Sequence, residues 1–255
     1  MRTELLYNPR LLCERLAELS IARRRRAQLR GTAAASLTDD HIDSLELLRL
    51  AGALHPTVVY DIGANVGTWT LLCKAVLPEV EVHAFEPLAQ HHAGFAMNTA
   101  ALSKVSLHQI ALGSDSGRMP CHVTSLSDAS SLLPPTDAAE REWQVREVAQ
   151  VDVPVERLDD WRARTGAPWP SLLKLDVQGF EVEVLKGAAD CLRHASAIIA
   201  EASFREFYAG QALFGDVVSF LNARGFVLHA LGRSTAIGRP LVQTDALFLS
   251  RQVAR

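Results

Sequence analysis

Short apolar runs alternate with helical patterns along most of the chain, and this rhythm constrains the fold more than any other feature. The expected strands are 58–62, 80–85, 105–111, 172–176, 197–202, 226–231 and 246–250. The expected helices between them are 68–76, 89–101, 181–185 and 215–224. Such alternation places helices on both faces of a mostly parallel sheet. We therefore predict a doubly wound, Rossmann-like α/β sheet of about seven strands whose C-terminal strand runs antiparallel.

The chain before residue 56 is predicted to be an N-terminal helical arm, and residues 56–255 the main domain. Leucines recur in the arm at helical spacing, at Leu5, Leu12, Leu16 and Leu19. The run Arg23–Arg26 follows, then a break at 31–36 and the N-cap candidates Thr38-Asp39-Asp40 of a second helix through Leu54. The arm could dock on an anionic membrane surface, or cover the main domain or a dimer partner. We favour the second because four arginines are few for binding lipid headgroups.

The strand and helix rhythm breaks between Gly113 and Asp159. This segment carries several serines and Pro134-Pro135 before the charged stretch Glu140–Glu147. Long loops in compact domains are often lids or substrate sites, and a surface loop without such a role is the alternative. We predict an insertion over about 113–159 at the C-terminal rim of the sheet.

Charge and cysteine spacing exclude several classes of protein. The net charge of −3 and the pI near 6.3 remove the positive field with which a nucleic-acid binder neutralises phosphates. The cysteines show neither zinc-site nor disulfide spacing. No apolar stretch has the length of a signal peptide or a membrane span. We expect reduced thiols, no nucleic-acid partner, no transmembrane segment and a cytoplasmic location.

A glycine turn with the sequence DIGANVGTWT follows the first expected strand directly. Gly63 and Gly67 have no side chains to keep a ligand from the backbone, and the next helix presents unpaired N–H groups there. The G-x-x-x-G spacing differs from the G-x-G-x-x-G that places a pyrophosphate on a helix in nicotinamide-binding folds. Asp61 at the strand end would repel a diphosphate, and it suits a ligand that carries an ammonium group.

The second expected strand ends in Phe85-Glu86-Pro87, which places a carboxylate beside the glycine turn. An acid at this position can accept hydrogen bonds from both hydroxyls of a ribose. Each signal is weak alone, because acids at strand ends are common. In this order on consecutive strands they predict a nucleoside site; the alternative is a glycine C-cap beside a solvated Glu86.

Several further segments carry a family resemblance. They are the turn DIGANVGTWT, FEP, ALGSDSG after the third strand, ASSL at 129–132, LLKLDVQGFEVEVLKGA at 172–188, FYAGQ and TDALFLS. Together they resemble the FkbM family of methyltransferases from about residue 57 to 251, and LKLDVQGFE is the most specific segment. The resemblance implies S-adenosylmethionine as methyl donor and O-methylation of a hydroxyl on a sugar, glycolipid or polyketide-type product.

The resemblance also implies roles by position. The glycine turn would line the methionine and ribose parts of the cofactor, with Asp61 at the amino-acid end and Glu86 on the ribose. Ile110 and Ala111 would border the adenine. Ser130 and Ser131 would lie near the cofactor or the acceptor. The candidate cofactor residues are Asp61, Gly63, Ala64, Asn65, Gly67, Thr68, Glu86, Pro87, Ile110, Ala111, Ser130, Ser131 and Asp176.

Three acids are the candidate catalytic residues. Asp176 ends the fourth strand, Glu181 follows shortly after, and Glu201 ends the next strand, at the rim where ligands bind in open α/β sheets. An alcohol needs alignment with the methyl carbon and a base or metal to activate it. We predict that these acids converge on the methyl position and favour one as base, its pKa raised by the others. The alternative is Mg²⁺ held by two or three of these carboxylates. Lys174 is a candidate ion-pair partner.

Two other functions stay open at this point. A nicotinamide-dependent oxidoreductase could use the same kind of fold, but the missing third glycine and Asp61 disfavour it. A non-catalytic interaction module could keep the nucleoside fold and use the arm with Arg23–Arg26. The arm also suits a homodimer without requiring one.

Overall fold

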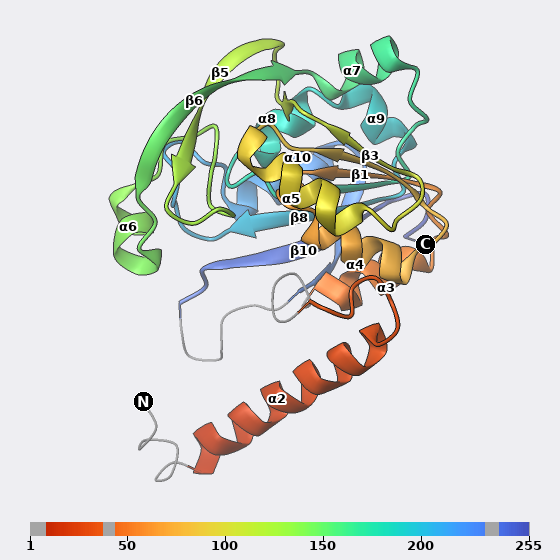
Figure 1. Ribbon diagram of the computed structural model, residues 1–255, viewed down its shortest axis with the longest axis vertical. Coiled ribbons are helices and arrows are strands. Elements are labelled where there is room, and N and C mark those ends of the chain that lie inside the picture. The colour runs from red at the N-terminus through yellow and green to blue at the C-terminus, as the bar shows by residue number, and fades with distance from the viewer. Residues whose placement is uncertain (1–8, 38–43, 233–239, 255) are drawn as a thin grey trace.

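A computed structural model describes residues 9–37, 44–232 and 240–254 (Figure 1). Its main sheet has seven strands in the order β3-β2-β1-β7-β8-β10-β9. β10 is antiparallel to both of its neighbours, and the other pairs are parallel. This confirms the predicted fold class. The strands are β1 (Val58–Ile62), β2 (Glu81–Phe85), β3 (Val105–His108), β7 (Leu172–Leu175), β8 (Ala197–Ser203), β9 (Phe226–Leu231) and β10 (Gln243–Ser250).

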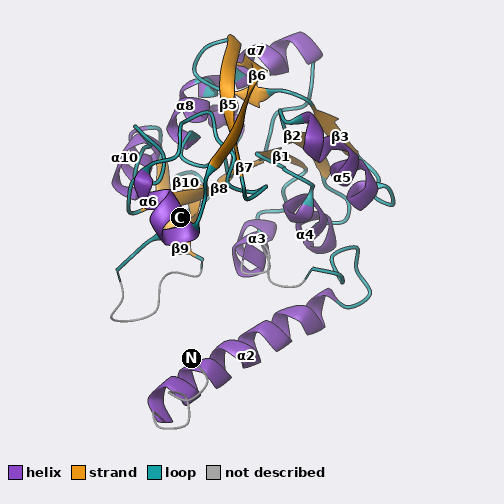
Figure 2. Ribbon diagram, turned by 60° about the vertical axis from the view of Figure 1, so that its left-hand side comes forward, coloured by secondary structure: helices purple, strands orange, loops and turns teal. Residues whose placement is uncertain are grey.

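Helices cover both faces of this sheet (Figure 2). One face carries α3 (Leu45–Gly52), α4 (Thr68–Val76) and α5 (Ala89–Thr99). The other carries α7 (Leu158–Thr165), α8 (Glu181–Lys186), α9 (Ala189–His194) and α10 (Phe214–Ala223). The central strands are buried on both sides, so they are almost continuously apolar.

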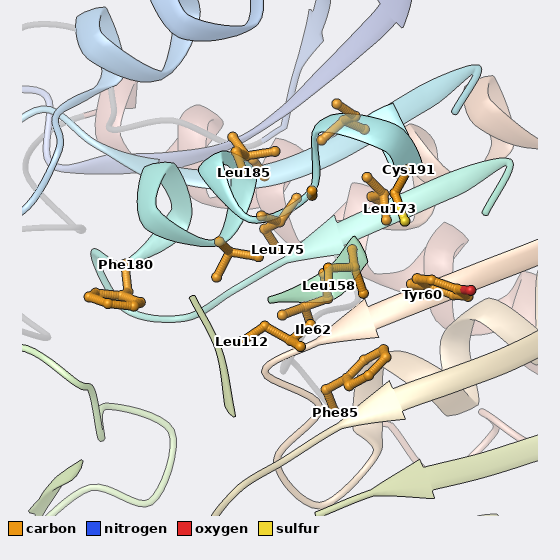
Figure 3. Packing of buried hydrophobic residues seen from close by; sticks show 14 of the residues in the cluster. Tyr60, Ile62, Phe85, Leu112, Leu158, Leu173, Leu175, Phe180, Leu185 and Cys191 are labelled. Atoms are coloured by element: carbon orange, nitrogen blue, oxygen red, sulfur yellow. The ribbon is translucent and has the colours of Figure 1, made fainter. Parts of the chain in front are cut away.

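The carboxyl ends of β1, β2 and β7 meet at one edge of the sheet. Ile62 is in register with Phe85 on one side and with Leu175 on the other. Just inside this edge, apolar side chains of the strands pack against those of α7, α8 and α9 (Figure 3). The residues that follow the three strands, Gly63, Glu86 and Asp176, therefore emerge beside one another.

The predicted insertion at 113–159 contains regular structure that the sequence pattern did not indicate. β4 (Ala111–Leu112), β5 (Gly117–Thr124) and β6 (Glu147–Glu156) form a three-stranded sheet in the order β4-β6-β5. α6 (Asp137–Trp143) lies between β5 and β6 in the chain. Much of β5 and β6 is exposed, so neither strand shows a continuous apolar run. The strand expected over 105–111 divides because β4 pairs with β6 and not with the main sheet.

The N-terminal helix α2 (Pro9–Leu29) extends away from the body (Figures 1 and 2). Its last turns are tied down by an Arg25–Glu46 hydrogen bond of 2.8 Å and by buried Leu29. Leucines at 12, 16 and 19 are exposed, and Leu5 lies outside the described residues. α3 packs into the body; the predicted N-cap at 38–40 also lies outside the described residues. Contact of the arm with a membrane or a second copy stays a prediction.

Two further observations concern cysteines and hydropathy. Cys13, Cys73, Cys121 and Cys191 are free thiols, and all but Cys13 are buried. Among the helices in the described ranges, none combines the length and the hydropathy needed to span a bilayer.

Candidate functional site

A cavity lies at the edge where β1, β2 and β7 end. It encloses about 710 Å³, its open mouth included. Its wall comes from the turn after β1, the residues after β2, the β4 region, segment 127–132 and the residues after β7. We call it the first cavity. The predicted cofactor residues that line it are Gly63, Asn65, Glu86, Pro87, Ile110, Ala111, Ser130, Ser131 and Asp176. That they bind a cofactor stays a prediction at this point.

Gly63 brings the turn after β1 into contact with the end of β7. Its φ is +83°, and a Cβ there would lie 1.9 Å from the carbonyl oxygen of Asp176. The Gly63 and Ala64 N–H groups both donate to the Phe85 carbonyl, at 3.0 Å each. A side chain at position 63 would therefore push apart the turn after β1 and the turn after β7, which both line the cavity.

Glu86 is buried, with 5% of its surface exposed, so the alternative of a solvated carboxylate is wrong. Its Oε2 accepts from the N–H of Asn65 at 3.0 Å, and its Oε1 accepts from the N–H of Leu88 at 2.8 Å. Each oxygen keeps a further lone pair for a ligand. The carboxylate is thus fixed beside the cavity before any ligand arrives.

His91 on α5 also lines the first cavity, and sequence reasoning missed it. Its Nδ1 lies 3.2 Å from Glu86 Oε1 but off the direction that a hydrogen bond needs, so this buried atom has no hydrogen-bond partner in the described part of the chain. A buried polar atom without a partner at a cavity wall is a place where a ligand can bind. Only its position one helical turn after FEP could have pointed to it.

Four predicted cofactor residues do not contribute to the described wall of the first cavity: Asp61, Ala64, Gly67 and Thr68. Asp61 is buried on the opposite face of β1 and accepts a hydrogen bond from Thr70 Oγ1 at 2.5 Å. Gly67 has a φ of +81°, and a Cβ there would lie 2.9 Å from the Phe95 ring. Asp61 points away from the cavity because successive side chains of a strand point to opposite faces. Gly67 shapes the turn after β1 and its packing against α5.

Asp176 forms the predicted ion pair with Lys174, with 3.0 Å between Oδ2 and Nζ. Lys174 is only 1% exposed. Burial lowers the pKa of Lys174, but the surrounding carboxylates, Asp176 first, outweigh it and raise the pKa above its usual value. The Lys174 side chain is therefore a buried ammonium group that favours the ionised form of Asp176.

Gln178 links Asp176, Glu201, Tyr208 and Ser131, and sequence reasoning did not identify it as a site residue. Its Nε2 donates to Asp176 Oδ1 and to Glu201 Oε2, at 2.9 Å each. Its Oε1 lies 3.0 Å from the Tyr208 hydroxyl, and its carbonyl oxygen accepts from Ser131 Oγ at 2.8 Å. The φ of Gln178 is +53°, an uncommon value for a residue other than glycine, and these bonds hold it there.

Glu201 lies next to Asp176, as predicted. One amide nitrogen of Gln178 bridges the two carboxyl groups, and Gln243 Nε2 donates to Glu201 Oε1 at 2.7 Å. Burial, then the charges of Asp176 and Asp245, raise the pKa of Glu201 well above its usual value.

Glu181 is near enough for electrostatic interaction with these two acids, but unlike them it lines neither cavity. Its Oε1 accepts from the N–H groups of Val177 at 3.2 Å and Gly179 at 3.1 Å. Burial raises the pKa of Glu181 to about 7, against the effect of these backbone hydrogen bonds. The side chain closes the turn after β7, because a carboxylate at the start of α8 can satisfy nearby N–H groups.

The Mg²⁺ alternative finds no support in this geometry. Of its three proposed ligands, Glu181 faces backbone amides and Asp176 is paired with Lys174. Across the described ranges, no group of three or more His, Cys, Asp or Glu side chains is arranged to hold a metal ion.

A second cavity of about 630 Å³, its open side included, adjoins the first. Asp128, Asp176 and Gln178 line both cavities. The remaining wall of the second cavity consists of Leu126, Ala129, Trp143, Val145, Glu201 and Gln243. Of the three predicted catalytic acids, Asp176 lines both cavities, Glu201 lines the second, and Glu181 lines neither. Asp176 thus lies where the two cavities meet.

A comparison of the sequence with known protein families identifies the family of this chain. The methyltransferase FkbM domain matches residues 61–228, which is more than half of the chain. The chain belongs to the FkbM methyltransferase family. This confirms the resemblance drawn from the turn, FEP and LKLDVQGFE, and membership makes the chain an S-adenosylmethionine-dependent methyltransferase. The oxidoreductase and non-catalytic alternatives receive no support from it.

Three curated relatives of this FkbM-family chain are informative. The 2-O-methyltransferase NoeI of Sinorhizobium fredii is 30% identical over 64% of this chain and 70% of its own length. The 31-O-demethyl-FK506 methyltransferase FkbM of Streptomyces tacrolimicus is 29% identical, with shares of 68% and 74%. The hexuronic acid methyltransferase AglP of Haloferax volcanii is 28% identical, with shares of 62% and 61%. The chain thus spans 61–74% of the length of these relatives.

Proposed function

We propose that this chain transfers the methyl group of S-adenosylmethionine to a hydroxyl group of a sugar, glycolipid or polyketide-type product. The observation that carries the proposal is the position of Asp176 between two adjoining cavities. The names of the three relatives support the acceptor class, since they describe methylation of a 2-O position, a 31-O position and a hexuronic acid.

The first cavity fits the nucleoside part of the donor. Glu86 offers a fixed carboxylate with spare lone pairs for ribose hydroxyls, and His91 Nδ1, 3.2 Å from Glu86 Oε1, is a buried atom without a hydrogen-bond partner among the described residues. Ile62, Phe85 and Leu112 give the cavity apolar surface for a base. When bound there, the cofactor supplies a sulfonium-activated methyl group.

Asp176 would accept the proton of the acceptor hydroxyl. It lines both cavities, and buried Lys174 favours its carboxylate form before the proton arrives. Gln178 fixes the other carboxylate oxygen, so the group is held in one orientation. Glu201, held by Gln178 and Gln243, would position the acceptor from within the second cavity. A base oriented in this way contributes about 10²–10⁴-fold to such a reaction.

The test is transfer of labelled methyl from S-adenosylmethionine into an extract of producing cells, separated into glycan, lipid, protein and small-molecule fractions. We expect label in the glycan, lipid or small-molecule fraction, and no change with EDTA. The Asp176→Asn protein should incorporate label about a hundredfold more slowly. The surface change Asp152→Asn, which removes an exposed partner of Arg118, should leave the rate unchanged. Label confined to protein, or no label although S-adenosylhomocysteine binds, contradicts the proposal.

A further inference from the structure

The second cavity has a wall whose chemistry restricts the acceptor further than the proposed function does. Five of its nine described lining residues carry a carboxyl or amide group, and these are Asp128, Asp176, Gln178, Glu201 and Gln243. The apolar part of the wall consists of Trp143 with the smaller side chains of Leu126, Ala129 and Val145. A ligand that fills this space therefore needs many hydrogen-bonding groups and one flat apolar face.

Trp143 is built into a rigid support. It is the last residue of α6, and its ring stacks on Phe207 with 4.2 Å between centroids and 21° between planes. Two further contacts hold α6 against segment 205–207. The Thr136 N–H donates to the Phe207 carbonyl at 2.8 Å, and Arg205 forms an ion pair with Glu142 at 2.6 Å. With Phe207 packed on it, the indole is a fixed aromatic surface at the cavity wall.

The polar side of the cavity is also fixed. Gln243 from β10 and Gln178 from the turn after β7 hold the two oxygens of Glu201. Asp128 adds an exposed carboxylate at the boundary between the cavities. These groups form hydrogen bonds with hydroxyls, and the carboxylates of Asp128 and Asp176 disfavour an anionic ligand.

We infer that the second cavity binds a neutral hexopyranose ring, with its C–H face on Trp143 and its hydroxyl groups toward Glu201 and Asp128. A sugar ring has one face of C–H groups and a rim of hydroxyls, and this matches the aromatic wall and the opposing carboxyl and amide groups. Trp143 and Gln243 are then the residues that set acceptor specificity. The inference rests on the proposed function, since the ring is the group that would present its hydroxyl to Asp176.

The test uses the full chain and three neutral probes, methyl α-D-glucopyranoside, methyl α-D-mannopyranoside and methyl α-L-rhamnopyranoside. Binding is measured by saturation-transfer NMR with and without S-adenosylhomocysteine. Methyl α-D-glucopyranosiduronic acid serves as the anionic probe and cyclohexylmethanol as the apolar ring alcohol. We expect at least one neutral glycoside to bind more tightly than both of these, and its Kd to rise about tenfold in Trp143→Ala.

Two further variants distinguish loss of the Trp143 ring from misfolding of Trp143→Ala. Trp143→Phe keeps an aromatic ring against Phe207 and should raise the Kd only about threefold. Trp169→Phe, at a tryptophan that stacks on His194 outside the cavity wall, should leave it unchanged. The sugar assignment is overturned if no neutral glycoside binds, if cyclohexylmethanol binds as tightly, or if Trp143→Ala has no effect. Calorimetry with S-adenosylhomocysteine distinguishes failure of the sugar assignment from failure of the proposed function. The proposed function predicts that S-adenosylhomocysteine binds, whereas the sugar assignment makes no prediction about it.

Discussion

The two cavities meet at Asp176 but are built in different ways. The first is formed by short segments that follow β1, β2 and β7 together with the β4 region and segment 127–132, and Glu86 fixes two backbone N–H groups of its wall. The second is formed by residues from five stretches far apart in the sequence, 126–129, 143–145, 176–178, 201 and 243, and hydrogen bonds join Gln178 and Gln243 to Glu201. A turn takes its shape from residues adjacent in the sequence, whereas the second wall requires segments that are far apart in the sequence to come together. Changes in the first should therefore alter cofactor affinity, and changes in the second should alter turnover.

The largest loss of stability is expected at Gly63, where the turn after β1 contacts the end of β7. Gly63→Ala should lower the free energy of unfolding by about 4 kcal/mol, because its Cβ would collide with the Asp176 carbonyl oxygen in a left-handed conformation. Gly225→Ala is the matched control, since its φ is +87° but no atom lies within 4 Å of its Cβ position. It should cost about 1 kcal/mol. Equal losses in urea unfolding would show that the contact between the turns is unimportant.

A smaller effect is expected from Glu181, whose carboxyl group accepts hydrogen bonds from the turn after β7. Its folded pKa of about 7 lies above the usual 4.5, so the unfolded chain ionises first as pH rises. Stability should fall between these values, by about 3 kcal/mol in total, and level off above them. Glu181→Gln should remove this dependence, and Glu183→Gln, on the exposed side of α8, should not. Unfolding at pH 5 and pH 8 measures it; parallel curves for wild type and Glu181→Gln would refute the shift.

Asp176→Asn should separate chemistry from cofactor binding. We expect turnover to drop about a hundredfold, which corresponds to about 2.7 kcal/mol, because the amide cannot accept the hydroxyl proton. Affinity for S-adenosylhomocysteine should stay within about threefold, since the ribose side is untouched. Single-turnover methyl transfer and calorimetry give the two values. Undiminished turnover would remove Asp176 from the chemistry.

The smallest of these effects concerns the first cavity alone. Glu86→Ala should weaken S-adenosylhomocysteine binding by about 2 kcal/mol, through loss of a charged hydrogen-bond acceptor and of the fixed Asn65 N–H. Glu79→Ala, an exposed acid before β2 that pairs with Lys104, is the control and should bind normally. Calorimetry that finds equal affinities for the two variants would end the ribose assignment.

The same contrast explains what could be predicted from the sequence. The strands, the Gly63 turn and Glu86 are local patterns, so spacing was enough to place them at one sheet edge. The face of β1 to which Asp61 points could also have been predicted, since successive residues of a strand alternate between its two faces and Asp61 lies between Tyr60 and Ile62. Trp143 and Gln243 could not be found in this way, because they reach the site only through the pairing of β5 with β6 and of β10 with β8.

The most direct measurement is a crystal structure of the protein with S-adenosylhomocysteine. The account predicts the ribose hydroxyls on Glu86, the adenine beside Ile110 and Ala111, and the sulfur next to Asp176, facing the second cavity. A sulfur that points away from Asp176, or a ligand seated in another part of the molecule such as the groove at Met119 and Lys186, would contradict it.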